Sequence, residues 1–203
     1  IWSQDGFLLL RYTNPTSIIS ASNVPVVLIV GNDIAYNNIF RGLSASGCDT
    51  HSLILVRGND CLEDYSLEEL DRFDVVVLYG YSYRDRDKSW ALLAEYVKNG
   101  GGLVIDTGYS PDTGGSMPAP CPVKEVNKSA VNRDWHSTYI DYQITNGIDF
   151  SSFSPAIYEG GPWGVSASGN DSVHSWAQPI FWDEGRPLVV CGHRTRGESS
   201  GLV

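Results

Sequence analysis

The sequence predicts an α/β protein of the flavodoxin-like type, a three-layer sandwich with a mostly parallel sheet of about five strands and helices on both faces. Short runs rich in Val, Ile and Leu recur along the first half of the chain, and such runs are typical of strands buried on both faces. They occupy residues 26–30, 52–56, 74–80 and 103–106. Helical patterns separate these runs, so we expect right-handed crossovers between parallel strands.

The first helix is expected over residues 34–46. It follows a break at Gly31, and the carboxylate of Asp33 is placed to cap its first turn. Apolar and small residues at helical spacing form the buried stripe of this helix. They are Ala35, Ile39, Gly42 and Leu43. Gly47 is a natural terminator.

Two further helical segments lie between the later strands. Ser66 and Glu69 have the spacing of a capping box and open a short helical turn that ends near Arg72. Residues 87–99 form an amphipathic helix, which three glycines at 100–102 end. Its apolar face consists of Trp90, Leu93, Ala94 and Val97.

The character of the sequence changes after Thr107. Residues 108–179 are rich in Gly, Pro, Ser and aromatic side chains, which indicates long loops and hairpins. Residues 180–182 and 187–192 are expected to pair as a hairpin. We therefore interpret residues 1–203 as one domain in four parts: residues 1–23 as an N-terminal edge strand and linker, 24–107 as the βα core, 108–179 as long loops and an insertion, and 180–203 as returning strands.

The composition excludes several functional classes. Against 24 acidic residues stand 14 Lys and Arg, giving a net charge of −10 without a basic cluster, which argues against binding nucleic acid or anionic lipid. The apolar runs are far shorter than the ~20 residues of a membrane helix. The chain starts at Ile1 rather than Met, so we expect a piece of a longer protein that meets a membrane only through flanking segments. One interpretation is the extracytoplasmic part of a membrane protein.

Cysteines and histidines form no recognisable site in the sequence. Four cysteines lack CxxC spacing and are interpreted as small hydrophobic residues. They are Cys48, Cys61, Cys121 and Cys191. The four histidines are scattered, and no phosphate-binding glycine motif occurs. We therefore expect neither a metal site nor a cofactor.

Several segments together resemble the class I glutamine amidotransferase-like superfamily. They are residues 26–31, 73–80, 92–107 (LLAEYVKNGGGLVIDT) and 185–197. The similarity is greatest to branches that are not amidotransferases, such as the trehalose-utilisation family and the small domain of some β-galactosidases. It covers about residues 24–108 and 185–203. The resemblance implies the flavodoxin-like fold, which hosts many different activities.

The resemblance also implies which activity is missing. Active members carry a nucleophilic Cys on a sharp turn after the fourth strand, with a His and a Glu late in the chain. Here that turn contains Asp106 and Thr107 but no Cys, and His193 and Glu198 lack the His-x-Glu arrangement. Amidotransferase activity is therefore not expected. Gly80 matches the glycine that in active relatives helps to form the oxyanion hole, or it simply ends a strand.

A ligand site is expected at the carboxyl ends of the strands, where open parallel sheets bind ligands. The residues predicted to form it are Asp33, Gly80, Tyr81, Tyr83, Asp106 and Thr107. The loop over residues 108–123 leaves the same edge and is a candidate lid. Trp135 and Trp163 either close this cleft or pack elsewhere.

Two functions remain open. The leading hypothesis is a non-catalytic amidotransferase-like domain that binds a small molecule or a partner within a larger, membrane-associated protein. The alternative is a carbohydrate-directed hydrolase or related enzyme that uses Asp106 or Asp33 at the strand ends. Exposed aromatic rings beside polar side chains are suited to stacking on sugars, so carbohydrate is the ligand class that we consider in both cases.

Overall fold

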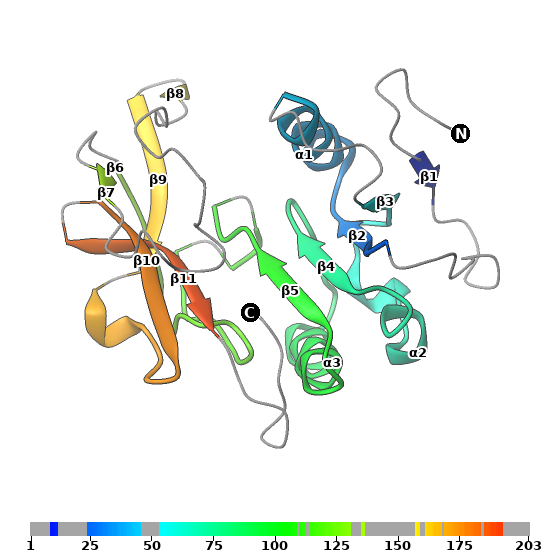
Figure 1. The fold of residues 1–203 in the computed structure, drawn as a ribbon. Coiled ribbons are helices and arrows are strands. Elements are labelled where there is room, and N and C mark those ends of the chain that lie inside the picture. Colours follow the sequence, from blue (N-terminus) through cyan, green and yellow to red (C-terminus); the bar gives the residue numbers. More distant parts are fainter. Residues whose placement is uncertain are drawn as a thin grey trace. The chain divides into compact units, whose positions relative to one another are not determined.

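Five parallel strands form the sheet at the centre of the first half of the chain (Figure 1). They are β1 (Leu9–Arg11), β2 (Val26–Val30), β3 (Ile54–Arg57), β4 (Val75–Leu78) and β5 (Gly102–Ile105). Their order is β1-β3-β2-β4-β5, and Val27 lies opposite both Leu55 and Val75. The order β3-β2-β4-β5 is that of flavodoxin-like sheets, with β1 added at the edge. The predicted fold class is confirmed.

The computed structural model describes ten segments of the chain. They are residues 9–11, 24–45, 53–108, 110–112, 114–130, 135–136, 157–158, 161–167, 169–183 and 185–192. The chain forms two compact units, residues 1–111 with 194–203 and residues 112–193. The boundary between the units falls close to Thr107, where the composition changes. Within the described residues, no helix has both the length and the apolar character needed to cross a membrane.

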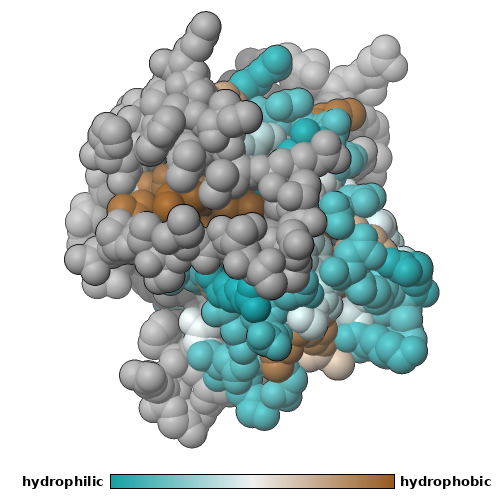
Figure 2. Space-filling model, turned by 90° about the vertical axis from the view of Figure 1, so that its right-hand side faces the viewer, coloured by the Kyte–Doolittle hydropathy of each residue, from teal (hydrophilic) through white to brown (hydrophobic). Residues whose placement is uncertain are grey.

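Helices cover both faces of the sheet. In Figure 1, α1 (Asp33–Ala45) lies on one side of the sheet, and α2 (Leu67–Leu70) and α3 (Arg86–Lys98) lie on the other. A short 3-10 helix, η2 (Leu62–Asp64), precedes α2. On the face shown in Figure 2, the described surface is mostly hydrophilic, as expected for a chain of net charge −10.

Helices α1 and α3 bury most of the stripes that their spacing predicts, but Gly42 of the α1 stripe is exposed. Under α1, Ile29 and Leu55 form a core with Tyr36, against which Ile39 and Leu43 pack. Under α3, three large side chains are at most 2% exposed: Trp90, Leu93 and Tyr96. The Tyr96 hydroxyl donates a hydrogen bond of 3.0 Å to the Phe73 carbonyl, and burial raises the pKa of Tyr96. Tyr36 and Tyr96 were not in the predicted stripes.

The start of α1 differs from the prediction by one residue. Asn32, not Asp33, caps the helix, because the Asn32 Oδ1 atom accepts from the Ala35 amide at 3.0 Å. The Asn32 amide donates to the Gly80 carbonyl at 3.3 Å, which holds Asn32 outside the helix. Asp33 therefore becomes the first helical residue, and its carboxylate serves another purpose.

The other two helix starts follow ordinary capping chemistry. The predicted capping box is confirmed: Ser66 Oγ accepts from the Glu69 amide at 3.3 Å, and Glu69 Oε2 accepts from the Ser66 amide at 2.7 Å. Helix α3 begins one residue before the predicted start, because Asp85 caps it by accepting from the Lys88 amide at 3.2 Å.

The described residues of the second unit form two antiparallel sheets, of order β11-β10-β7 and β6-β9-β8. The elements are β6 (Val126–Ala130), β7 (Trp135–His136), β8 (Ile157–Tyr158), β9 (Gly161–Ala167), η4 (Asn170–Ser172), β10 (Ala177–Asp183) and β11 (Arg186–Gly192). The predicted hairpin is confirmed as β10 and β11. Its turn contains Gly185 at a φ of 79°, a backbone conformation that favours glycine.

Candidate functional site

Polar segments follow β2, β3, β4 and β5 at their carboxyl ends. The predicted site residues belong to three of these segments: Asp33 follows β2, residues 80–83 follow β4, and Asp106 and Thr107 follow β5. Since β2, β4 and β5 are parallel neighbours, these segments share one edge of the sheet. Asp33, at the start of α1, and the two loops therefore lie at one edge of the sheet, and their side-chain contacts show which members can act together.

The loops after β2 and β4 meet at the topological switch point, where successive strands are added on opposite sides of β2. A Cβ atom on Gly31 would lie 1.8 Å from the Tyr79 carbonyl oxygen, so only a glycine allows this approach. Gly80 has a φ of 65°, which favours glycine at this turn. Its carbonyl accepts the Asn32 amide. These contacts account for Gly80 as the residue that turns the chain at the end of β4.

Asp33 is directed toward β3. Its carboxylate forms an ion pair with Arg57, the last residue of β3. The Arg57 guanidinium also lies over the Tyr36 ring, 5.9 Å from its centroid. Because β2 and β4 both lie between β3 and β5, Arg57 engages Asp33 on the side of the sheet away from Asp106. The two carboxylates of the proposed hydrolase therefore serve different neighbours.

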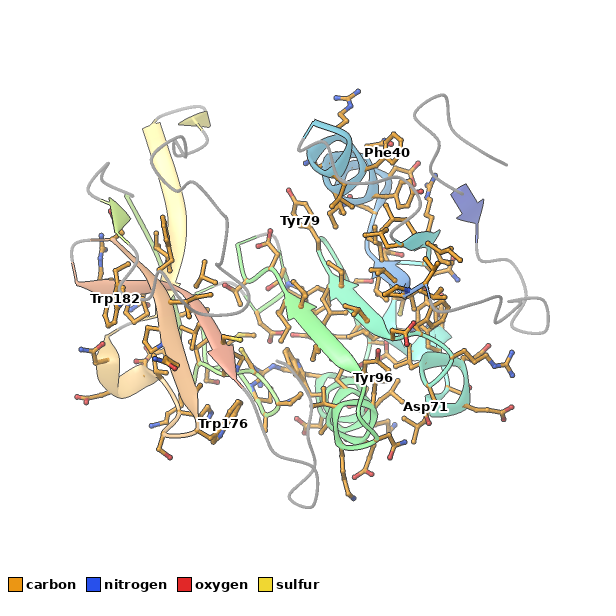
Figure 3. All side chains as sticks on the ribbon, viewed as in Figure 1. Phe40, Asp71, Tyr79, Tyr96, Trp176 and Trp182 are labelled. Atoms are coloured by element: carbon orange, nitrogen blue, oxygen red, sulfur yellow. The ribbon has the colours of Figure 1, made fainter. Side chains whose placement is uncertain are left out.

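The loop after β4 presents an aromatic pair. The rings of Tyr81 and Tyr83 are 6.5 Å apart and inclined by 48°. Tyr81 is only 4% exposed, whereas Tyr83 is half-buried. Tyr79, at the start of this loop, accepts a hydrogen bond of 3.1 Å from the Asn38 side chain of α1 (Figure 3). Tyr81 is therefore a packing residue of this loop, and Tyr83 is the member of the pair that is exposed enough for a ligand to reach.

The turn after β5 is built by Asp106. Its amide donates to the Leu78 carbonyl at 2.8 Å, and its Oδ1 atom accepts from the Gly108 amide at 2.6 Å. This side-chain-to-backbone bond is a common way for Asp to close a turn. Thr107, at the tip, is half-buried.

A second cluster at the same edge was not predicted, and it joins the loops after β3 and β4. Ser82 donates from its amide to the Asp60 carbonyl at 2.7 Å and accepts the Leu62 amide at 3.0 Å. Cys61 and Ser82 thus form a parallel β-bridge, although β2 separates β3 from β4 within the sheet.

Three side chains, which we call the clasp, secure this pairing: Cys61, Glu63 and Arg84. Glu63 Oε1 accepts the backbone amides of Arg84, at 2.6 Å, and Asp85. The Cys61 thiol donates to Glu63 Oε2 at 3.1 Å, and Arg84 Nε donates to the Cys61 sulfur at 3.3 Å. The interpretation of Cys61 as a small hydrophobic residue is therefore wrong, because charged groups contact its sulfur.

The electrostatics of the clasp follow from these contacts. Partial burial acts to raise the pKa of Glu63, but hydrogen bonds from the Asp85 amide, the Cys61 thiol and nearby backbone amides outweigh it. Together they lower this pKa from 4.5 to about 2. The pKa of Arg84 is raised, first by its hydrogen bond to Cys61 and further by the nearby carboxylate of Asp64. The run Asn-Asp-Cys-Leu-Glu-Asp at 59–64 was the available sequence signal.

Replacing Glu63 with glutamine is expected to weaken the acid dependence of stability. Because the folded-state pKa of Glu63 lies below its ordinary value, its carboxylate stabilises the fold above pH 4.5, and this contribution is lost as the pH falls toward 2. The Glu63→Gln protein should be less stable at pH 6 and lose less stability between pH 5 and 3. Urea unfolding at several pH values measures both effects.

The matched control is Glu68→Gln in α2. The Glu68 side chain is 87% exposed and pairs only with Arg72, at 3.2 Å, among the ion pairs of the described residues. This variant should retain the pH dependence of the wild type, since exposed pairs contribute little. Equal pH dependence in Glu63→Gln and wild type would contradict the assignment.

The described part of the second unit offers packing rather than a comparable polar edge. The rings of His174 and Trp176 stack with their centroids 5.2 Å apart. The Trp176 ring also lies against Gly192, where an added Cβ atom would be 2.1 Å from the ring. Burial raises the pKa of Cys121 to about 12. Trp135 and Trp163 lie in β7 and β9, but their side chains are outside the described ones. Across the described segments, no group of three or more His, Cys, Asp or Glu is placed to hold a metal ion.

Comparison with known proteins agrees with this fold. Over 83% of this chain and 71% of its own, a ThuA-like protein from Bacteroides uniformis superposes with a TM-score of 0.50 at 12% identity. This likeness shows a shared α/β fold. Residues 55–118 match the family model called Domain of unknown function (DUF8560). No curated protein sequence matches the chain.

The matched segment contains most of the candidate site. It includes the clasp and every predicted site residue except Asp33. The comparison thus shows the class of fold, a flavodoxin-like α/β domain, and the turn after β5 carries Asp106 and Thr107.

Proposed function

We propose that the first unit is a non-catalytic, amidotransferase-like binding domain that holds a small carbohydrate at the carboxyl ends of β4 and β5. The observation that supports the proposal is that the tyrosine pair and the turn of Asp106 and Thr107 follow neighbouring parallel strands, β4 and β5, at one edge of the sheet. An aromatic face next to carboxylate and hydroxyl groups is the combination that recognises the apolar face and the hydroxyls of a sugar.

The charges at this edge favour a neutral ligand over an anionic one. Two of its arginines are already paired: Arg57 with Asp33, and Arg84 with Asp64. The chain as a whole carries a net charge of −10, which repels phosphates and carboxylates at long range. A sugar needs no positive partner and is compatible with this surface.

The enzyme alternative is less well supported by the side-chain contacts. A general base must reach the reacting proton, but the Asp33 carboxylate is engaged by Arg57 and the Asp106 Oδ1 atom by the Gly108 amide. Both contacts have structural roles in their loops. A partner domain within a longer, membrane-associated protein is the remaining alternative occupant of this edge.

Trehalose, glucose and galactose are the probes for an NMR titration of the ¹⁵N-labelled protein. At least one of them is expected to shift the amides of residues 80–83 and 106–108. Tyr83→Ala should weaken that binding by about tenfold, as loss of a stacking ring costs roughly 1–2 kcal/mol. The matched control is Asp71→Asn, because Asp71 precedes β4 and lies at the amino end of the sheet (Figure 3).

Two results would overturn the proposal. Shifts confined to the amino end of the strands, or binding unchanged in Tyr83→Ala, would place the ligand elsewhere. Hydrolysis of a glycoside that Asp106→Asn abolishes would identify an enzyme instead. The absence of binding by all three sugars would reject carbohydrate as the ligand class.

A further inference from the structure

The loop between β4 and α3 holds Tyr83 between two attachments. Residues 79–85 form this loop. Just before Tyr83, Ser82 forms the backbone bridge to Cys61, and just after it, the next two amides donate to the Glu63 carboxylate. Both attachments lead to the loop after β3, so the half-buried Tyr83 lies within a stretch that is fixed to one neighbouring segment.

The two attachments are of different kinds. The Ser82 amide donates to the Asp60 carbonyl at 2.7 Å, a backbone contact that does not depend on the side chains of the two residues. The second attachment depends on one side chain, because Glu63 Oε1 accepts the amides of both Arg84, at 2.6 Å, and Asp85. Hydrogen bonds to an ionised acceptor are shorter and stronger than neutral ones. Glu63 is therefore the side chain on which the position of the second half of the loop depends.

The Glu63 carboxylate is itself held in place. Its other oxygen, Oε2, accepts from the Cys61 thiol at 3.1 Å, so the group cannot rotate away from the loop without losing a bond on either side. Partial burial acts to raise the pKa of Glu63, but the hydrogen bonds from the Asp85 amide, the Cys61 thiol and nearby backbone amides lower it to about 2. The acceptor is therefore both fixed and ionised at neutral pH, as the orientation of a loop requires.

We propose that Glu63 is a positioning residue of the candidate ligand site, which holds the loop of residues 79–85 so that Tyr83 meets a bound sugar in one orientation. The sugar comes from the proposed function, on which this part of the inference rests. The fixing of the loop rests on the contacts alone. A segment that is ordered before binding loses less conformational freedom when the ligand binds, and the affinity is higher for that reason.

Removal of the Glu63 carboxylate is expected to weaken binding without removing any group that the proposed site offers to the sugar. The two loop amides would then bond to water. Ser82 keeps its backbone bridge, and Asp85 keeps its cap on α3, in which its Oδ1 atom accepts from the Lys88 amide at 3.2 Å. The loop therefore stays attached at both ends, but Tyr83 samples more orientations.

The test compares Glu63→Ala with Asp85→Ala, the matched control. Asp85→Ala removes the cap of α3 at the same junction but retains the backbone amides that Glu63 accepts. In Glu63→Ala, amide hydrogen exchange of Arg84 and Asp85 should become about tenfold faster, while Leu78 in β4 keeps its protection. The affinity for whichever of trehalose, glucose and galactose binds the wild type should fall about fivefold. In Asp85→Ala, both quantities should stay within about twofold of the wild type, although the protein is less stable.

A readout that needs no ligand separates the positioning role from the proposed function. The ¹⁵N order parameter of the Tyr83 amide should be about 0.85 in the wild type and below about 0.6 in Glu63→Ala. Glu63→Gln, which keeps an acceptor oxygen but no charge, should show a smaller effect of the same sign and serves where Glu63→Ala does not fold.

The outcomes are distinguishable. An unchanged order parameter with unchanged exchange in Glu63→Ala would overturn the proposal, as would a mobile Tyr83 that binds the sugar as tightly as before. Equal losses of affinity in Glu63→Ala and Asp85→Ala would reduce Glu63 to a merely structural role and overturn it too. A wild type that binds none of the three sugars would reject the proposed function, but a mobile Tyr83 in Glu63→Ala would still show that Glu63 positions this loop.

Discussion

Replacing Trp90 with alanine is expected to lower the free energy of unfolding of the first unit by about 3–5 kcal/mol. Trp90 lies on α3, is 2% exposed and is among the largest fully buried side chains. Removal of its ring leaves a cavity beside α3 that the surrounding side chains fill only in part. Since whole domains are stable by about 5–15 kcal/mol, this loss removes a large share of the total.

Circular dichroism during urea unfolding measures this effect on the right part of the chain, because the described α-helices all belong to the first unit. Trp90→Phe is the matched control, since it keeps an aromatic ring in the site and should lose less stability. A loss below about 1 kcal/mol in Trp90→Ala would show that this contact between α3 and the sheet contributes little.

The burial of Trp90 was predictable because helical spacing is a local property. Trp90, Leu93 and Val97 are written at three- and four-residue steps, and all three are buried. Tyr96 has the same burial but was missed, because a tyrosine has a polar hydroxyl and its buried position depends on a partner. That partner is the Phe73 carbonyl, which no local pattern in the sequence identifies.

In the candidate site, too, the location could be predicted from the sequence but the side-chain contacts could not. The edge was predictable, because polar residues follow parallel strands and all carboxyl ends lie together. The direction of each side chain was not. Asp33 was expected to cap α1. The hydrogen bond from the Asn32 amide to the Gly80 carbonyl instead makes Asn32 the cap, and Asp33 pairs with Arg57.

The polar run at 59–64 was a local signal for one side of the clasp, but no local pattern indicated that Arg84 contacts it. Glu63 and Arg84 come from loops that follow β3 and β4, which are not neighbours in the sheet. The loops meet only because β2 ends between them and turns into α1. The contact therefore depends on strand order, and strand order depends on crossovers that a single sequence specifies only as a class.

The close approach of the loops after β2 and β4 gives the other prediction of large effect. Gly31→Ala is expected to destabilise the first unit by about 3 kcal/mol, at the upper end of the usual cost of overpacking. The added Cβ would lie 1.8 Å from the Tyr79 carbonyl oxygen and 3.0 Å from its carbon. Both are backbone atoms, so no side-chain rotation relieves the overlap.

The backbones on both sides of this contact are already fixed, which is why the cost should be high. Val30 pairs with Leu78 in the β2–β4 ladder, and the Asn32 amide donates a hydrogen bond to the Gly80 carbonyl. The loops therefore cannot separate without breaking one of these attachments. In Gly42→Ala, the matched control on α1, the added Cβ meets no atom within 4 Å. It should instead stabilise the helix by up to about 1 kcal/mol. Urea unfolding of both variants measures the difference, and equal stability of the two would mean that the β2 and β4 loops do not approach as closely as this site requires.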